Sequence, residues 1–335
     1  MERRNFVKGA AAGVLVSTGV IGGVKALSGD FDVFTTPLLM GPAKQLAKPY
    51  GDLKVILLGT GNPISSNYRS KPAQVVLAGN KAFLVDCGAG AVERLIEVGI
   101  CPESIDDVFI THHHSDHNSG FIDLFISRIV GGALPGKMIP LNLYGPTNSQ
   151  AIMGKIIDHL QWDIFLRVTQ TADSAEGAKL AIFEKDEGVV YDQDGVKVTT
   201  FLVDHGIVKP AVGYKFQYQG KSVVISGDTR PNDNLLEYAQ GSDILIHEAY
   251  SQKWLDIGVA KFPDKAAKAE GIKQYHSSVF EAAEIAQKAG VKQLVFSHLM
   301  PSPAPFWVFE KHWASGASDI FNGSITVGRD LKMIT

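Results

Sequence analysis

Short apolar runs separated by turn residues characterise the chain from Leu53 onward. The runs are rich in β-branched residues and are bounded by Gly, Asn, Asp and Pro, which is typical of strands. They predict strands at 54–58, 74–77, 82–85, 108–110, 196–202, 211–217, 222–225, 244–246 and 294–296.

Apolar residues at helical spacing occur between these runs, as at Val92, Leu95, Ile96 and Val98. The same spacing predicts helices at 147–159, 234–239, 279–289 and around 306–313. Strands and helices alternate in both halves with no low-complexity break, which favours one domain whose sheets are covered by helices. Segment 161–190 has weaker periodicity and mixed charge, and we expect a surface insertion there.

The first residues have the pattern of an export leader. Arg3, Arg4 and Lys8 precede an apolar stretch at 9–24, followed by small residues. The pattern resembles a twin-arginine signal, so we expect residues 1–28 to be a signal peptide that directs the folded protein to the periplasm through the twin-arginine export machinery. A membrane anchor or a plain amphipathic leader is the alternative. Residues 29–51 are irregular and predict a lead-in to a domain at 52–335.

Composition and charge exclude several classes of protein and site. The chain has 335 residues, 45% of them hydrophobic and 20% charged, which is ordinary for a globular protein. Its 2 cysteines exclude a disulfide framework and a four-thiolate zinc site. A formal charge of −3 argues against nucleic acid held by bulk positive charge.

The segment after the strand at 108–110 holds the strongest candidate chemistry. It contains His112, His114, Asp116 and His117 within six residues. Alternate residues of an extended segment share a face, so His112 and His114 can point toward one ion. Imidazole and carboxylate are ligands that suit zinc and similar divalent ions. A polar surface loop is the alternative, but the apolar segments on both sides would then bury many unsatisfied polar groups.

This H-x-H-x-D-H pattern, with later single histidines and an aspartate, resembles the metallo-β-lactamase superfamily, and within it the ribonuclease Z and arylsulfatase-like branch. The resemblance runs from about Leu53 to Ile334 and implies a four-layer αββα sandwich with two metal ions. It places His205 with His112 and His114 on one ion. It places His298 with Asp116 and His117 on the other, and Asp228 of the S-G-D-T turn between them.

Further residues match the branch one at a time. His247 and Glu248 lie in an H-E-A motif that departs at Tyr250, and His276 begins an H-S-S motif. The resemblance implies that His276 holds the oxyanion or protonates the leaving oxygen, with Glu248 or His247 orienting it. A structural role for His247 is equally open. Asp86 is expected to orient a ligand histidine, or to cap a helix.

The resemblance implies a hydrolase with two divalent ions, zinc first and manganese or iron as alternatives. Metal binding lowers the pKa of water from about 16 to about 7, which supplies a bridging hydroxide. We expect a small phosphoester or sulfoester substrate. A lactonase or thioester hydrolase, a tRNA 3′-processing endonuclease and a non-catalytic metal-binding envelope module are the alternatives.

The choice of a small ester rests on a missing basic arm, on the charge of −3, on the export leader and on an aromatic cluster. Ribonuclease Z enzymes that this sequence resembles carry a long basic arm, whereas only a hairpin fits between Tyr214 and Gly227, so we expect no nucleic-acid partner. Aromatic residues after the last ligand are expected to line the mouth of the pocket, although half of them could be core residues: Phe306, Trp307, Phe309 and Trp313. Apolar surface at 121–126 suggests a possible homodimer.

Overall fold

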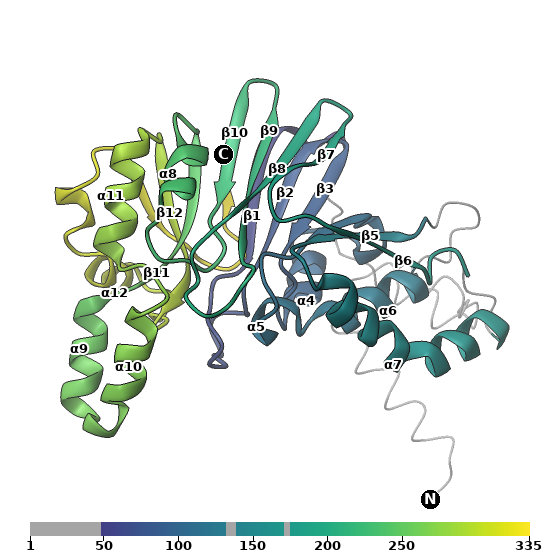
Figure 1. Ribbon diagram of the computed structural model, residues 1–335, viewed down its shortest axis with the longest axis horizontal. Coiled ribbons are helices and arrows are strands. Elements are labelled where there is room, and N and C mark those ends of the chain that lie inside the picture. The colour runs from purple at the N-terminus through teal and green to yellow at the C-terminus, as the bar shows by residue number, and fades with distance from the viewer. Residues whose placement is uncertain (1–47, 132–138, 171–174) are drawn as a thin grey trace, which may run out of the picture. The chain divides into compact units, whose positions relative to one another are not determined.

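Two sheets of seven strands each pack face to face in the computed structural model, which describes residues 48–131, 139–170 and 175–335 (Figure 1). The first sheet has the order β14 (Met333–Ile334), β1 (Gly51–Gly59), β2 (Ala73–Gly79), β3 (Lys81–Val85), β4 (Asp107–Phe109), β5 (Leu141–Gly145) and β6 (Leu180–Glu184). The second has the order β13 (Ser324–Val327), β12 (Gln293–Met300), β11 (Ile244–Tyr250), β10 (Lys221–Ile225), β9 (Val212–Tyr218), β8 (Val196–Leu202) and β7 (Gly188–Gln193).

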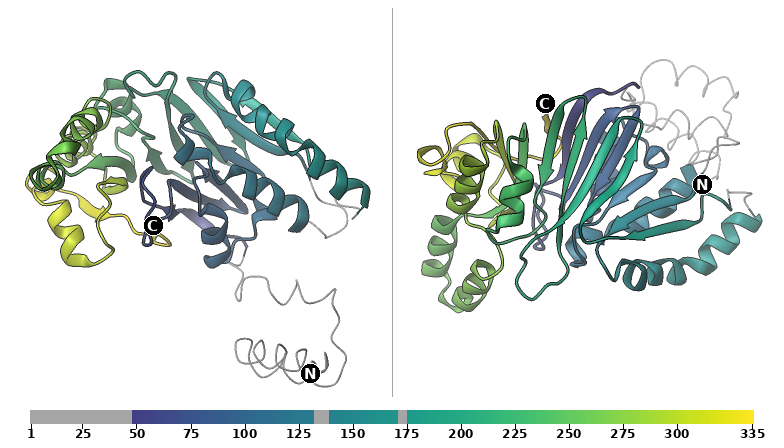
Figure 2. Two further views of the ribbon diagram at one scale, coloured as in Figure 1. Left: turned by 90° about the horizontal axis from the view of Figure 1, so that it is seen from below. Right: turned by 45° about the horizontal axis from the view of Figure 1, so that its top comes forward.

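Helices cover the outer face of each sheet (Figure 2). The first sheet is covered by α4 (Ala91–Glu97), α6 (Phe121–Gly131) and α7 (Ser149–Gln170). The second is covered by α8 (Asp233–Ala239), α11 (Val279–Ala289) and α12 (Trp307–Trp313). The remaining helical segments are α5 (Ser115–Asn118), α9 (Gln252–Lys261), α10 (Ala266–Lys273), η1 (Pro102–Ser104), η2 (Pro263–Lys265) and η3 (Ala317–Asp319). The predicted four-layer sandwich is confirmed.

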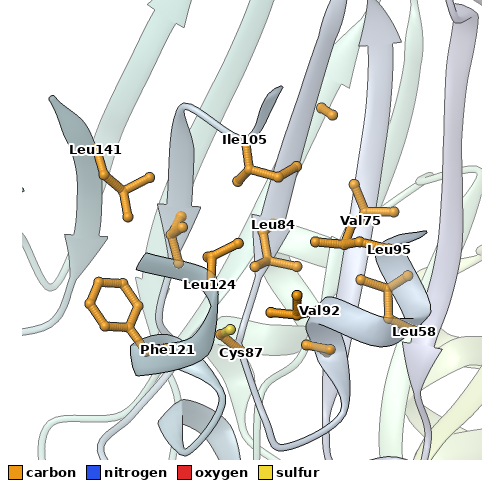
Figure 3. Packing of buried hydrophobic residues seen from close by; sticks show 14 of the residues in the cluster. Leu58, Val75, Leu84, Cys87, Val92, Leu95, Ile105, Phe121, Leu124 and Leu141 are labelled. Carbon is orange, nitrogen blue, oxygen red and sulfur yellow. The ribbon is translucent and has the colours of Figure 1, made fainter. Parts of the chain in front are cut away.

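Strand β1 shows why its second half, Val55 to Leu58, is apolar without interruption. Val55 and Leu57 face the second sheet, whereas Ile56 and Leu58 face the helices on the other side. A strand that is buried on both faces needs apolar residues at every position. Figure 3 shows the helix-facing part of this core, where Leu58 lies with residues of β2, β3, α4 and α6.

Segment 161–190 differs from the prediction. It is not a surface insertion: α7 continues to Gln170, β6 is the outer strand of the first sheet, and β7 is the outer strand of the second. Both strands are only partly buried, so their sequences lack the continuous apolar character of central strands.

Several other elements were not predicted. The apolar segment 121–130 lies within helix α6, which its sequence alone did not predict. Strands β5, β13 and β14 and helices α9 and α10 were not predicted, and each of these two helices buries only one residue. Residues 1–28, with the expected leader, and most of 29–51 lie outside the described residues. Within the described part of the chain, no helix combines the length and apolar character needed to cross a bilayer.

Candidate metal centre and its cavity

The histidine-rich loop after β4 is attached to both sheets. Tyr214 of β9 donates a hydrogen bond from its hydroxyl to the Ile110 carbonyl over 2.8 Å. The Val212 amide donates to the Thr111 carbonyl over 2.9 Å, and the Thr111 amide donates to Asp86 over 2.8 Å. Because these bonds fix the backbone on both sides, the loop presents its imidazoles at the edge of the sandwich.

Asp228 follows Gly227, whose backbone conformation and close neighbours leave no room for a side chain. Gly227, just before it, has φ 62°, and a Cβ there would lie 2.7 Å from the Val212 carbonyl oxygen and 3.0 Å from Cβ of Thr111. His298 lies in β12 at φ 45°, a left-handed conformation that is unusual for histidine. Strained backbone of this kind occurs mostly at functional sites.

The structure brings seven side chains together at this edge, and we call them the seven-residue cluster: His112, His114, Asp116, His117, His205, Asp228 and His298. His112, His114, His205 and Asp228 form one group of possible metal ligands, and Asp116, His117 and His298 form a second. All except His114 are buried.

One carboxylate oxygen lies between the two groups. Asp228 Oδ2 is 3.8 Å from Nε2 of His112, and it is 3.4 Å and 3.3 Å from Nε2 of His117 and His298. Four ligands at about 2.0–2.1 Å from a zinc ion stand about 3.4 Å from one another in a tetrahedron. The spacing of the donor atoms therefore fits one divalent ion in each group, with Asp228 shared.

The other ring nitrogens are held by neighbours. Nδ1 of His117 lies 2.8 Å from Oδ2 of Asp86, and Nδ1 of His205 lies 2.9 Å from the Tyr275 carbonyl oxygen. Such contacts fix the tautomer and turn Nε2 toward an ion. Asp86 thus has the contact expected of an orienting partner, whereas Gly90 is the N-cap of α4.

The buried polar atoms and shifted pKa values of the cluster also suit a bound cation. His117 Nε2 and Asp228 Oδ1 are buried without a hydrogen-bond partner among the described residues. Burial lowers the pKa of His205 to about 4, which keeps that imidazole neutral and able to bind a metal. Burial opposes a proton on His117, yet Asp228 and Asp86 raise its pKa well above the usual value. A site that holds a proton between carboxylates is suited to a divalent ion in the proton's place.

His276 stands next to the cluster. Its Nδ1 lies 2.9 Å from Oε1 of Glu248 and 4.0 Å from Oδ2 of Asp228. The same Glu248 oxygen accepts hydrogen bonds from the amides of Thr229 and Ser277, over 3.0 Å and 3.2 Å. Burial raises the pKa of Glu248, with Asp228 adding to the effect, and burial lowers the pKa of His276.

His247 is turned away from this pair. Its Nδ1 lies 2.6 Å from the Glu248 carbonyl oxygen, and burial lowers its pKa to about 4. Neighbouring residues of a strand point to opposite faces, so Glu248 and not His247 reaches His276. His113 likewise points away from the cluster, toward the Ser149 hydroxyl over 3.0 Å.

A cavity of about 660 Å³ opens over the cluster. His114, Asp116, Asp228, His276 and His298 line its base. One side is formed by residues of α9, η2 and α10 that sequence reasoning missed: Trp254, Leu255, Val259, Phe262, Lys265, Lys268 and Ile272. They belong to no motif, and the signal in the sequence that could have indicated α9 was its apolar cluster Trp254, Leu255, Ile257 and Val259.

The aromatic residues predicted at the mouth lie elsewhere. Trp313 is buried in the core behind the second sheet, where its Nε1 donates to the Pro301 carbonyl over 2.8 Å. Trp307 lines a separate cavity with Arg329 and Asp330. Phe306 and Phe309 are exposed and are not among the described residues that line the metal-side cavity. Proximity to His298 in sequence was misleading, because α12 turns away from the strand end.

Comparison with known proteins identifies the family. Residues 53–257 match the family described as Anti-Pycsar protein Apyc1. Ribonuclease Z of Mycobacterium avium (strain 104) is 36% identical over 282 residues, which cover 84% of this chain and 98% of that protein. The chain belongs to the Apyc1 and ribonuclease Z family. Ribonuclease Z of Mycobacterium marinum is 35% identical over the same length.

Solved structures of other proteins share the fold of this chain. The metallo-β-lactamase fold protein YhfI of Bacillus subtilis has a TM-score of 0.63 at 19% identity, covering 84% of this chain and 98% of that one. The short form of human tRNase Z has a TM-score of 0.60 at 22% identity, covering 84% and 98%. These structures show the metallo-β-lactamase fold, and the relatives that are 36% identical make the chain a metal-dependent hydrolase.

Two predictions are wrong in the light of these relatives. The relatives are named for an activity on RNA, which contradicts the expected small-ester substrate and the absence of a nucleic-acid partner. The predicted periplasmic location was based on the leader pattern of residues 1–28, which lie outside the described residues, and the ribonuclease Z relatives contradict it. The net charge of −3 misled because it averages over the whole chain, whereas RNA contacts depend on local charge.

Proposed function

We propose that the protein is a metal-dependent endoribonuclease that hydrolyses a phosphodiester bond of RNA, of the type that processes the 3′ end of transfer RNA. The observation that carries this proposal is the position of Asp228 Oδ2, within 3.3–3.9 Å of both groups of ligand histidines at the base of an open cavity. The identity to ribonuclease Z proteins along nearly their whole length supports it.

The seven-residue cluster would hold two divalent ions. His112, His114 and His205 would bind one, and Asp116, His117 and His298 the other, with Asp228 on both. Bound ions supply an activated water nucleophile and stabilise the charge that develops on the phosphoryl oxygens. Imidazole with carboxylate suits zinc, and manganese or iron are the alternatives.

Side chains of this protein would transfer the protons during hydrolysis of the phosphodiester. Asp116 lines the cavity and would accept the proton of the attacking water as its oxygen bonds to phosphorus. His276 would donate a proton to the leaving ribose oxygen as the phosphorus–oxygen bond breaks. Glu248, 2.9 Å from Nδ1, would hold His276 in place. The nucleophile is then water, and not the 2′-hydroxyl of the substrate.

A precursor transfer RNA with a 3′ trailer tests the proposal directly. Metal-loaded protein should release the trailer, and mass spectrometry should find no 2′,3′-cyclic phosphate. A substrate with a single 2′-deoxynucleotide at the cleavage position should be cleaved at a similar rate, because the 2′-hydroxyl takes no part. An aryl sulfate and a homoserine lactone serve as control substrates.

Two results would overturn this proposal. One is protein with two bound ions that hydrolyses either control substrate and leaves the RNA intact. The other is cleavage that requires the 2′-hydroxyl. Metal analysis by mass spectrometry should give two ions per chain, with zinc as the preferred metal in reconstitution.

A further inference from the structure

The connection between β9 and β10 has few residues that could contact RNA. Gln219 and Gly220 alone join the two strands, at φ 49° and φ 77°, so this connection is a tight turn. A substrate of many nucleotides nevertheless needs protein contacts beyond the cleaved bond. Among the described segments that border the cavity, 251–275 contributes more lining residues than any other; it holds α9, η2 and α10, and we call it the α9–α10 hairpin.

We propose that the α9–α10 hairpin binds the single strand of RNA next to the cleaved bond, with Lys265 and Lys268 on backbone phosphates and Phe262 stacked on a base. This inference rests on the proposed ribonuclease function and assigns the substrate-binding element of the same site.

The hairpin is attached to the candidate metal centre at both ends. It begins directly after β11, which carries Glu248, and the Ser251 amide donates to the Met300 carbonyl over 2.8 Å. At its other end, the Tyr275 carbonyl lies 2.9 Å from Nδ1 of His205. The two helices lie side by side beyond the sheets (Figure 1), and a small core that includes Leu255 and Ala269 joins them to the strand ends. The position of the hairpin relative to the cluster is therefore fixed.

Positive charge is concentrated on this hairpin. The segment has five lysines against three acidic residues: Lys253, Lys261, Lys265, Lys268 and Lys273, with Asp256, Asp264 and Glu270. Lys265 and Lys268 line the cavity. Lys268 makes no ion pair within the described part of the chain, and Lys265 pairs with its neighbour Asp264 at 2.9 Å, where both side chains are more than 60% exposed. Exposed pairs of this kind are weak, so both lysines can bind phosphate.

Aromatic surface lies beside these lysines. Phe262 lines the cavity and is 53% exposed. Trp254 also lines it, and its Nε1 donates to Nδ1 of His312 over 3.0 Å, which fixes the indole as a wall. Bases of single strands stack on such rings without regard to sequence. A cavity of about 660 Å³ holds one or two nucleotides but not a duplex, which favours a single-stranded occupant.

The phosphate contacts are tested by removing the two cavity lysines. The probe is a fluorescein-labelled oligoribonucleotide, bound to metal-loaded protein in a His276→Ala background that slows cleavage. Lys265→Ala with Lys268→Ala should weaken binding about tenfold at low salt. The slope of log affinity against log salt should become less negative by about 1.4, at about 0.7 per phosphate contact. The matched control, Lys197→Ala with Lys288→Ala, removes two exposed lysines outside the hairpin and the cavity and should leave both values unchanged.

The stacking contact is tested in the same assay. Phe262→Ala should weaken binding roughly tenfold. Ile257→Ala truncates an apolar residue of the same hairpin that is 54% exposed and lies outside the cavity lining, and it should bind like the parent. Circular dichroism and metal content of each variant report whether the fold and the centre are intact.

The outcomes separate the two proposals. If unsubstituted protein neither binds nor cleaves RNA while it holds two ions, the ribonuclease function fails. If it cleaves RNA but the cavity variants bind like their controls, only the assignment of the hairpin is overturned. If a cavity variant loses its metal or its fold, the single variants Lys268→Ala and Lys268→Gln are measured instead, and unchanged affinity in both overturns the phosphate contact.

Discussion

The seven-residue cluster and the α9–α10 hairpin face the same cavity and are built in opposite ways. The cluster comes from loops and strand ends far apart in the chain, and six of its seven members are buried. The hairpin is one continuous segment whose cavity-facing lysines are exposed. The chemistry is thus held by the rigid sandwich, whereas the proposed RNA contacts lie on an element that the sandwich does not need for its core.

This difference separates two kinds of substitution. A change in the cluster leaves a buried charge or a buried polar atom without its partner, and its effect should be large and should extend to metal content. A change on the hairpin removes a contact with solvent-exposed side chains, and its effect should be limited to substrate affinity. The predictions below test this separation.

The largest effect is expected for Asp228→Ala. Asp228 Oδ2 is the oxygen that both groups of ligands share, so its loss should lower the metal content below two ions per chain and reduce RNA cleavage to the detection limit. Asp192→Ala, at an exposed position of β7, should keep both metal content and rate. If the Asp228→Ala variant keeps its activity, the shared oxygen has no part in the mechanism.

A smaller effect is expected for His276→Ala, because this residue lies beside the ligands and not among the two main groups. The value of kcat should fall by about 10²–10⁴ with two ions still bound, as for loss of a general acid. The decrease in kcat should be smaller for Glu248→Gln, since the amide oxygen can still accept a hydrogen bond from Nδ1 of His276. Rapid-quench measurement of single turnovers separates this chemical step from RNA release. Loss of metal in His276→Ala would instead make it a ligand.

Asp86→Asn should act on metal affinity alone. Its carboxylate holds Nδ1 of His117 at 2.8 Å, and loss of such an orienting partner costs about 10–100-fold in metal affinity. Competition with a chelator measures this affinity. Excess metal should restore cleavage, whereas a variant that stays inactive when fully loaded would give Asp86 a direct part in the reaction.

The smallest effect is expected from salt. With two phosphate contacts on the hairpin, raising salt from about 50 to about 200 mM should increase KM for RNA about sevenfold, because each contact contributes about 0.7 to the slope. The value of kcat should change little, since the cluster is buried. A KM that does not respond to salt would contradict a charged hairpin contact.

The sequence allowed the cluster to be predicted more fully than the cavity around it. His112 and Asp228 follow strands of β-branched residues and His298 lies in β12, and the resemblance of their motifs to the metallo-β-lactamase superfamily allowed the fold and the gathering of these residues to be inferred together. Helices α9 and α10 each bury a single residue, Leu255 and Ala269, so no continuous apolar face shows which side of them borders a cavity. For the same reason the aromatic wall was assigned to Trp307 rather than Trp254, whose place depends on how two distant segments pack.

The turn at Gly227 has a consequence for how such proteins diverge. A side chain there would collide with the start of β9 and with Thr111, so no single exchange at this position is accommodated by its surroundings. Random variation followed by selection should therefore recover glycine at 227 almost without exception, while positions 253–273 accept many residues. New substrate preferences can thus arise by drift in one helical hairpin, with no intermediate that has lost the ability to hydrolyse.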